Sequence, residues 1–189
     1  MLEYYSLFMK RPLLFAFLLI SSFTGIAQGD KLPWQENTKL TWNHFTGNAD
    51  LSSEFFARTE YSFQYSSGTD ANKLLTIHVK CSFDKSKSWK KPEKKLTPEL
   101  LAHEQGHFDL AELFARKMRK AFAEYAATHK DGPTTSADLA AIFKRYMNEC
   151  YALQNTYDKE TDHSKNTAKQ EEWNKKIPTL LAQLSQYKI

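Results

Sequence analysis

The chain has little of several features that commonly identify a class of protein. Its 189 residues include only two cysteines, Cys81 and Cys150, which excludes a scaffold held by several disulfides. The formal net charge of +4 is too small by itself to indicate nucleic-acid binding. Internal repeats and low-complexity tracts are also lacking. The composition therefore favours an ordinary globular domain.

A long apolar run is lacking too. The apolar stretch Pro12 to Phe23 follows the positive pair Lys10-Arg11 and precedes the small residues Gly25-Ile26-Ala27. It is too short for a comfortable membrane span and instead matches a secretory signal peptide. We expect residues 1–27 to be cleaved, leaving no membrane span in the mature form. An uncleaved N-terminal anchor is the alternative, and export to the periplasm or the extracellular space follows either way.

The remaining residues, 28–189, fit one domain with a substantial core. Apolar and polar side chains alternate from Phe55 to Tyr65 and again from Leu75 to Phe83, which is typical of strands with one buried face. The turn-like cluster from Ser66 to Asp70 separates them and predicts an antiparallel pair. A weaker third strand is expected near Lys39 to Trp42.

Helices follow the strands. Thr97-Pro98-Glu99 has the N-cap residue, first-turn proline and first-turn acid that begin a helix, and Asp131-Gly132-Pro133 is a stop signal. A second helix is expected from Ser136 to about Gln154, and a less regular third one from Lys165 to Tyr187, broken or kinked at Pro178. The predicted class is α+β, a small antiparallel sheet followed by a long helix and further helices.

The first of these helices carries the sequence His103-Glu104-Gln105-Gly106-His107. Residues four apart share one helix face, so both histidines can bind one ion, and Glu104 can reach a metal-activated water as general base. The histidines share a stripe with Leu110 and Phe114, on the buried side. Burial of two unpaired histidines would be costly, whereas one Zn²⁺ satisfies both. Two surface histidines beside a solvated glutamate are the alternative.

Other polar residues of the region carry weaker expectations. Asp109 and Glu112 point away from the metal, and Glu112 can pair with Arg116 on the surface. The lysine-rich segment from Asp84 to Lys95, with Trp89 in its middle, is a solvated connector or else a basic rim for an acidic partner. Cys81 and Cys150 form one disulfide or remain free buried thiols.

A catalytic zinc site needs a third protein ligand. A short-spaced third histidine is absent, and His44, His78 and His129 are poorly placed, which leaves His163. Asp158 and Glu160, in the same polar segment, are carboxylate alternatives, and a wet loop without any ligand is the remaining possibility.

Two supporting roles are expected near His163. Asp158 or Asp162 can accept the second ring N–H of a ligand histidine and so fix its tautomer. Tyr157 is a candidate catalytic residue, as a hydrogen-bond donor to a developing oxyanion.

Three separated blocks resemble a family of predicted secreted zinc-dependent proteases of bacteria, catalogued as a domain of unknown function. They are the motif helix from Leu101 to Arg116, the pair Leu40-Thr41-Trp42 and Phe45-Thr46-Gly47, and the later Tyr157-Asp158-x-x-Thr161-x-His163. The resemblance implies a zincin-like fold and supports His163 as a metal-site residue. Family members often have glycine where this chain has Ser164.

These observations predict a secreted or periplasmic zinc metallopeptidase that hydrolyses peptide or protein substrates. His103, His107 and His163 hold one Zn²⁺, and Glu104 is the general base. A zinc-binding envelope interaction domain without catalysis is the alternative. A third hypothesis is a basic protein that binds acidic surfaces through Trp89 and the neighbouring lysines.

Overall fold

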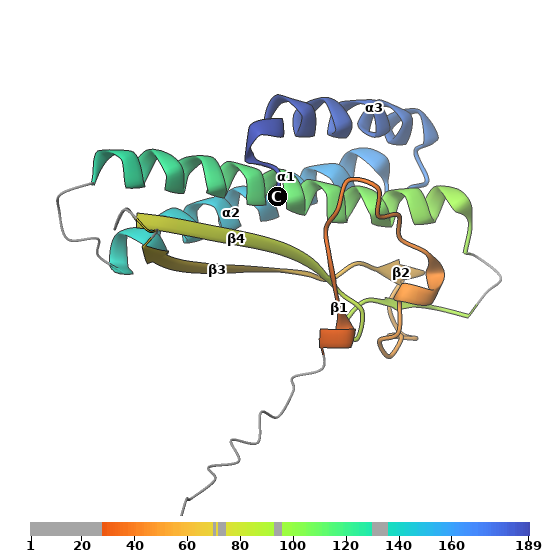
Figure 1. The fold of residues 1–189 in the computed structure, drawn as a ribbon. Helices are drawn as coiled ribbons and strands as arrows, with labels where there is room; N and C mark the ends of the chain where they lie inside the picture. Colours follow the sequence, from red (N-terminus) through yellow and green to blue (C-terminus); the bar gives the residue numbers. More distant parts are fainter. Residues whose placement is uncertain (1–27, 70, 72–74, 93–95, 130–135) are drawn as a thin grey trace, which may run out of the picture.

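The computed structural model describes residues 28–69, 71, 75–92, 96–129 and 136–189 (Figure 1). The expected signal peptide lies outside the described residues. The element order is η1 (Gln28–Asp30), β1 (Lys31–Pro33), η2 (Trp42–His44), β2 (Ala57–Arg58), β3 (Tyr61–Thr69), β4 (Leu75–Asp84), β5 (Trp89–Lys90), α1 (Pro98–Thr128), α2 (Ser136–Thr161), α3 (Thr167–Gln183) and η4 (Ser185–Tyr187). The class is α+β, as the sequence predicts.

The main sheet has three antiparallel strands in the order β1-β4-β3. The predicted hairpin is confirmed, with Phe63 opposite Cys81, and alternate β4 residues Val79, Cys81 and Phe83 are buried. The expectation of a strand near Lys39 to Trp42 is wrong, because this segment packs on α1 rather than on a strand. The Leu40 N–H donates to the Gln105 side chain, 2.7 Å away, and the third strand is β1.

The alternating segment from Phe55 to Tyr65 divides between two sheets. β2 pairs with β5 in a separate two-stranded sheet, whereas β3 pairs with β4. Between them, Glu60 donates its N–H to Ser88 Oγ at 2.9 Å and accepts from the Asp84 N–H at 2.8 Å. Trp89 lies in β5 and is buried. The expectation of a wet connector around Trp89 is therefore wrong.

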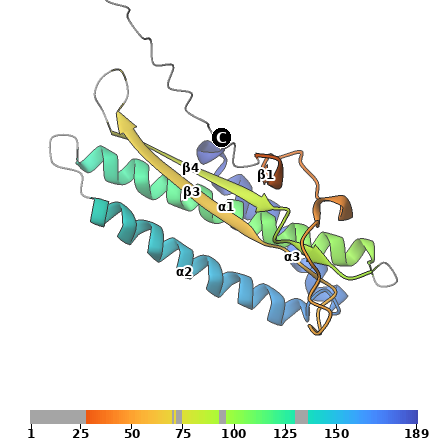
Figure 2. The ribbon, with the colours of Figure 1, turned by 90° about the horizontal axis from the view of Figure 1, so that it is seen from below.

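α1 is the centre of the fold. Its first turn is capped by Thr97, whose side chain accepts from the Leu100 N–H, and it packs on β4, α2 and α3. Figure 1 shows α1 lying along the β3–β4 ribbon, and Figure 2 shows α2 running beside it. Phe108, Leu110 and Phe114 are almost fully buried along its middle. A helix enclosed on several sides holds its side chains in fixed positions.

The last two helices differ from the expected boundaries. α2 begins at Ser136 as predicted but continues to Thr161, so much of the segment interpreted as a polar loop is helical. Asp162, His163 and Ser164 then adopt positive φ angles of 45°, 50° and 75° and reverse the chain into α3. Pro178 lies inside α3 without ending it.

The structure corrects one expectation about buried groups and decides between the two alternatives left open for the cysteines. Glu112 pairs with Arg116 as predicted, but the pair is buried, with side-chain exposures of 1% and 2%. Cys81 and Cys150 are buried free thiols and not a disulfide. Within the described ranges, no helix is long and apolar enough to cross a membrane.

Candidate metal centre

The two histidines of the motif lie on one face of α1, one turn apart. Their Nε2 atoms are 3.1 Å apart, and their ring centroids are separated by 4.7 Å. The His103 side chain is 2% exposed and that of His107 is 14% exposed. The predicted pairing of these two side chains is confirmed.

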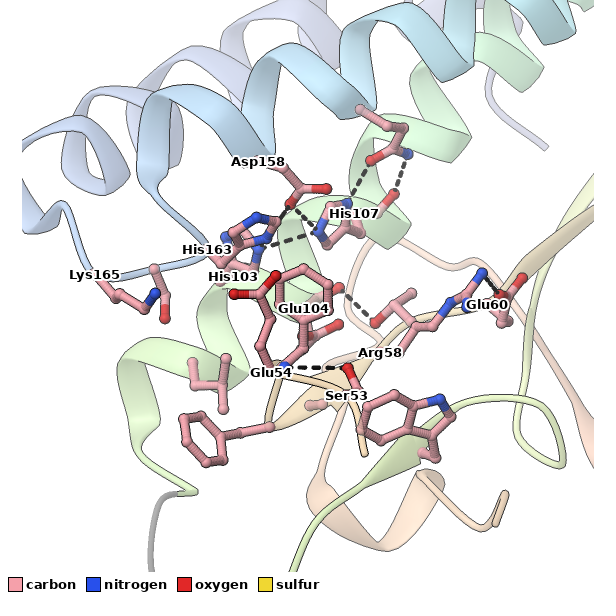
Figure 3. Close-up of a pocket in the computed structure, with 18 of the residues that line it drawn as sticks. Ser53, Glu54, Arg58, Glu60, His103, Glu104, His107, Asp158, His163 and Lys165 are labelled. Carbon is pink, nitrogen blue, oxygen red and sulfur yellow. Dashed lines mark hydrogen bonds and ion pairs between the residues drawn. The ribbon is translucent and has the colours of Figure 1, made fainter. Parts of the chain in front are cut away.

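Asp158 comes to the same point from α2. Its Oδ1 lies 2.9 Å from His107 Nε2 and 3.2 Å from His103 Nε2, and Figure 3 shows the three side chains converging. Because α2 continues to Thr161, Asp158 lies on a rigid helix rather than in a loop. One oxygen and two nitrogens from two helices thus approach a common centre.

The other nitrogen of each ring is held by an amide. His107 Nδ1 lies 2.6 Å from Gln154 Oε1, and Gln154 Nε2 donates to the His107 carbonyl at 2.9 Å. A carbonyl can only accept, which fixes the orientation of the Gln154 amide and makes Nδ1 the protonated nitrogen of His107. The unprotonated Nε2 therefore faces the common centre, as in metal-binding histidines.

A closed chain of hydrogen bonds does the same for His103. Tyr157 donates its hydroxyl hydrogen to the His103 carbonyl at 3.2 Å and accepts from Gln170 Nε2 at 2.8 Å. Gln170 Oε1 is thereby directed at His103 Nδ1, 3.0 Å away. The Nδ1 of His103 carries the proton, and its Nε2 also faces the centre.

Tyr157 is therefore not placed as the oxyanion donor expected from the sequence. Its ring is fully buried and stacks on His103 at 4.7 Å, and burial raises the pKa of its hydroxyl well above the usual range. A Cβ on Gly106 would lie 2.3 Å from the Tyr157 oxygen, which explains why the motif has glycine at this position. Tyr157 positions His103 and does not face the cleft.

The carboxylates and nitrogen lone pairs that meet at this centre favour a proton or a metal ion between them. Burial raises the pKa of Asp158, and His103 and His107 hold this pKa well below its usual range when their Nε2 atoms are protonated and donate to the carboxylate. Burial lowers the pKa of His107, and the Asp158 and Glu104 carboxylates outweigh burial and raise it. Asp158 Oδ1 makes no hydrogen bond within the described structure. A shared proton, or a metal ion, offsets the repulsion between these lone pairs.

His163 stands at the edge of the cluster. Its Nδ1 is 3.5 Å from Asp158 Oδ1, and its ring packs on Phe55 with centroids 4.4 Å apart. His103, Asp158 and His163 each offer a donor atom within 4.8 Å of the others. The sequence-based choice of His163 is thus consistent with the geometry, but Asp158 lies closer to the helical pair.

The remaining acids of the segment lie elsewhere. Glu160 accepts from Trp173 Nε1 at 2.8 Å, and exposed Asp162 forms a long ion pair with Lys165. Of the two carboxylate alternatives to His163, only Asp158 is at the centre.

Two of the other histidines also lie outside the centre. His44 accepts from the Thr41 N–H, and exposed His129 stacks on Tyr125.

Glu104 is the third functional side chain expected of the motif. It is only 3% exposed, and its Oε2 has no hydrogen-bond partner in the part of the chain described. Its main-chain carbonyl accepts from Thr59 Oγ1 at 3.2 Å. A buried carboxylate oxygen without a donor is costly, and here it borders a cleft where a water or substrate can supply the missing hydrogen bond.

That cleft has a volume of about 730 Å³. Loop residues 50 and 53–56, β2, the start of α1 and the end of α2 form its walls, and His103, Glu104, His107, Asp158 and His163 are at its base. Its size suits a polypeptide segment or a ligand of several functional groups.

The donor set fits a zinc ion. Tetrahedral ligands at about 2.0–2.2 Å from zinc are about 3.3–3.6 Å apart, whereas the three donor atoms here are 2.9, 3.1 and 3.2 Å apart. An opening of a few tenths of an ångström accommodates the ion, and two neutral imidazoles with one carboxylate are ligands that zinc accepts.

Sequence reasoning missed the two amides. Gln154 and Gln170 are buried and contact the histidines, but a glutamine has no distinctive spacing or charge. Only the helical interval between Gln154, Tyr157, Asp158 and Thr161 offered a signal that this segment faces α1.

Comparison with known proteins identifies a family but no activity. The model of a family described as "Bacterial protein of unknown function (DUF922)" matches residues 44–164. These residues make up more than half of the chain, which therefore belongs to this family. No curated protein and no solved structure matches the chain.

Proposed function

We propose that this member of the DUF922 family is a zinc-dependent peptidase. One observation carries the proposal. The Nε2 atoms of His103 and His107 and one oxygen of Asp158 lie within 3.2 Å of one another, and each histidine Nδ1 is held by a glutamine. Beside them is the buried Glu104, whose Oε2 has no hydrogen-bond partner among the described residues. A zincin-like arrangement, with the metal helix after a small sheet, is part of this proposal.

In the proposed site His103, His107 and Asp158 are the metal ligands. Zinc bound there would lower the pKa of a water and polarise the scissile carbonyl. Glu104 accepts the water proton at its free Oε2 and delivers it to the leaving amine. Gln154, Gln170 and Tyr157 hold the imidazoles in the tautomer and orientation that binding requires.

The cleft can also hold an extended substrate. β2 lies along it, and β5 is the only strand paired with β2 among the described elements. The other edge of β2 can therefore pair with a peptide in the manner of an added strand. Such pairing places a main-chain carbonyl near the base of the cleft without requiring a particular side chain.

Export is part of the proposal and depends on the leader residues alone. The positive pair Lys10-Arg11, the short apolar run and the small residues up to Ala27 support a signal peptide. The peptidase would then act in the periplasm or outside the cell.

The test compares the protein with its Glu104→Gln variant. Both are expected to bind one zinc ion, and only the original protein should hydrolyse a peptide library. The rate should fall about 10²- to 10⁴-fold in the variant, as is typical of a lost general base. Equal hydrolysis by both proteins would remove Glu104 from the mechanism, and no hydrolysis by either zinc-loaded protein would refute the peptidase.

A second candidate is a zinc-binding interaction domain without catalysis. His163 favours it, because its Nδ1 lies only 3.5 Å from Asp158 Oδ1, and four protein ligands would close the coordination sphere as in structural zinc sites. X-ray absorption of the zinc-loaded protein distinguishes the two. Three protein ligands and a water favour the peptidase, and four protein ligands favour the interaction domain.

A further inference from the structure

The cleft has the opposite charge to the molecule as a whole. The chain has a net charge of +4, whereas acids outnumber lysine and arginine among the residues that line the cleft. The acids are Asp50, Glu54, Glu60, Glu99, Glu104 and Asp158, and the bases are Arg58 and Lys165. A cleft lined by one sign of charge concentrates ligands of the other sign.

Several of these acids have partners. Glu60 forms an ion pair with Arg58 at 2.6 Å, and Asp50 accepts from Ser52. Glu54, by contrast, forms no ion pair within the residues described. Figure 3 shows its side chain rising from the loop toward the histidines. Glu99 is a second carboxylate without an ion pair among the described residues. It accepts hydrogen bonds from the Thr97 side chain and from its own main chain.

Aromatic side chains line the same cleft as these carboxylates. Phe55, Phe56, Trp89 and Tyr151 all line the cleft, and Phe55 and Tyr151 are 37% and 57% exposed. Large apolar side chains with this exposure are uncommon in the described structure, yet two of them are at one cleft. An aromatic face next to a carboxylate suits a lysine or arginine, whose stem packs on the ring while the charged end meets the acid.

The wall that carries Glu54 and Phe55 is firmly held. Lys91 Nζ donates to the carbonyls of Leu51 and Ser53, and the Lys91 N–H donates to the Phe56 carbonyl at 2.7 Å. Phe55 contacts His163 on the opposite wall. A preformed wall can discriminate between side chains, because little ordering is needed on binding.

We propose that this cleft selects polypeptides with a lysine or arginine side chain close to the scissile bond. Glu54 and Glu99 supply the charge, and Phe55 and Tyr151 supply the aromatic surface. This inference rests on the proposed peptidase activity, because only a hydrolysed peptide has a scissile bond. The recognition of the basic side chain is itself a binding property of the same cleft. It names Glu54 and Glu99 as specificity-determining residues.

The first experiment measures hydrolysis by the zinc-loaded protein. A randomised peptide library locates the cleavage position, and matched peptides with Lys, Arg, Gln or Glu beside it then give kcat/KM. Lysine and arginine peptides should exceed the glutamate peptide by about tenfold, less so at high salt. Glu54→Lys and Glu99→Lys should each reduce this ratio about threefold to tenfold.

A matched control separates the cleft from the general charge. Glu171 is an exposed glutamate of α3 that does not line the cleft, so Glu171→Lys should leave the ratio unchanged. Cleavage without any preference for a basic residue would overturn the proposal. An equal loss of preference in Glu54→Lys and Glu171→Lys would overturn it as well.

A binding experiment keeps this inference separate from the peptidase itself. Fluorescent peptides with Lys or Glu at the varied position are titrated into the zinc-loaded Glu104→Gln protein, with and without Glu54→Lys. Tighter binding of the lysine peptide that Glu54→Lys abolishes supports the proposal even where no hydrolysis is found. Equal affinity for the two peptides, or no binding of the lysine peptide, refutes it.

Discussion

Two groups of buried polar residues lie on the same helix, α1, and they differ in how far their hydrogen-bonding groups find partners within the protein. The first group, around His103 and His107, borders the cleft and keeps unpaired oxygens on Glu104 and Asp158. The second group lies further along the helix, where Glu112 accepts from Arg116 at 3.1 Å and from Arg119 at 2.8 Å.

The second group is closed by main-chain carbonyls. Arg116 donates to the Leu181 carbonyl at 2.7 Å, and Arg119 donates to those of Val79 and Tyr187 at 2.9 Å. One Arg116 nitrogen, Nη2, is without a partner among the described residues, although the guanidinium lies over the Trp34 ring. This group fastens the C-terminal segment and the sheet to α1.

The contrast shows how buried polar residues divide between stability and function. A network in which nearly all donors and acceptors match each other holds the fold together without a ligand. A cluster that presents several lone pairs to one point, next to a cleft, is of the kind that a bound cation stabilises, as proposed for this site. Four substitutions can break or sharpen this comparison.

The largest effect is expected from Glu112→Ala. Its removal leaves two buried guanidinium groups without a counter-charge, and the free energy of unfolding should fall by about 3–5 kcal/mol. Denaturant unfolding measures the loss. Glu149→Ala removes an exposed partner of Arg145 and should change stability by less than about 1 kcal/mol. Comparable losses in both variants would mean that the buried network has no special role.

Asp158→Asn should have the opposite kind of effect, with a large loss of zinc affinity and a small change in stability. The substitution keeps the shape of the side chain but removes a proposed ligand charge, so zinc affinity should fall by more than about 100-fold. Without zinc, stability should change by only about 1 kcal/mol, because the Asp158 carboxylate is partly exposed. Zinc titration with a competing chelator measures the affinity. Unchanged affinity would exclude Asp158 as a ligand.

Gly106→Ala tests the approach of Tyr157 to the motif helix. The new Cβ would meet the Tyr157 oxygen, and the strain should lower the free energy of unfolding by about 1–3 kcal/mol. Thermal and denaturant unfolding measure this loss. An alanine that stabilises the protein, as expected at a helix position with free space, would show that Tyr157 does not pack as described.

The smallest effect is expected from Gln154→Ala. Loss of the amide frees the His107 ring to change its tautomer and orientation, and zinc affinity should fall about tenfold. Gln183→Ala, at the exposed end of α3, is the control and should leave the affinity unchanged. Equal affinities in the two variants would assign Gln154 to packing alone.

Much of the fold could be predicted from local patterns. The hairpin and the start of α1 follow from period-two alternation and from the Thr97 cap, which depend on neighbouring residues only. β1 and the division between β2 and β3 could not be predicted, because pairing with β4 and β5 involves residues far away in the sequence. The continuation of α2 was missed because its buried stripe includes the polar residues Gln154 and Thr161.

The site was predictable to the extent that its residues share one helix. The spacing of His103 and His107 identified their common face, and the later segment supplied Asp158 and His163, which lie beside the two histidines in the structure. The sequence could not predict which of these two lies closer to His103 and His107, since that depends on how α2 crosses α1. Burial of Glu112 had a signal in the apolar residues on both sides of it, which indicate a helix enclosed all round.

The most direct test of the metal centre is a crystal structure of the zinc-loaded protein with anomalous diffraction measured at the zinc edge. The account expects one strong peak at about 2.0–2.2 Å from His103 Nε2, His107 Nε2 and an oxygen of Asp158. A peak bound elsewhere, or none at this point in crystals grown with zinc, would contradict it.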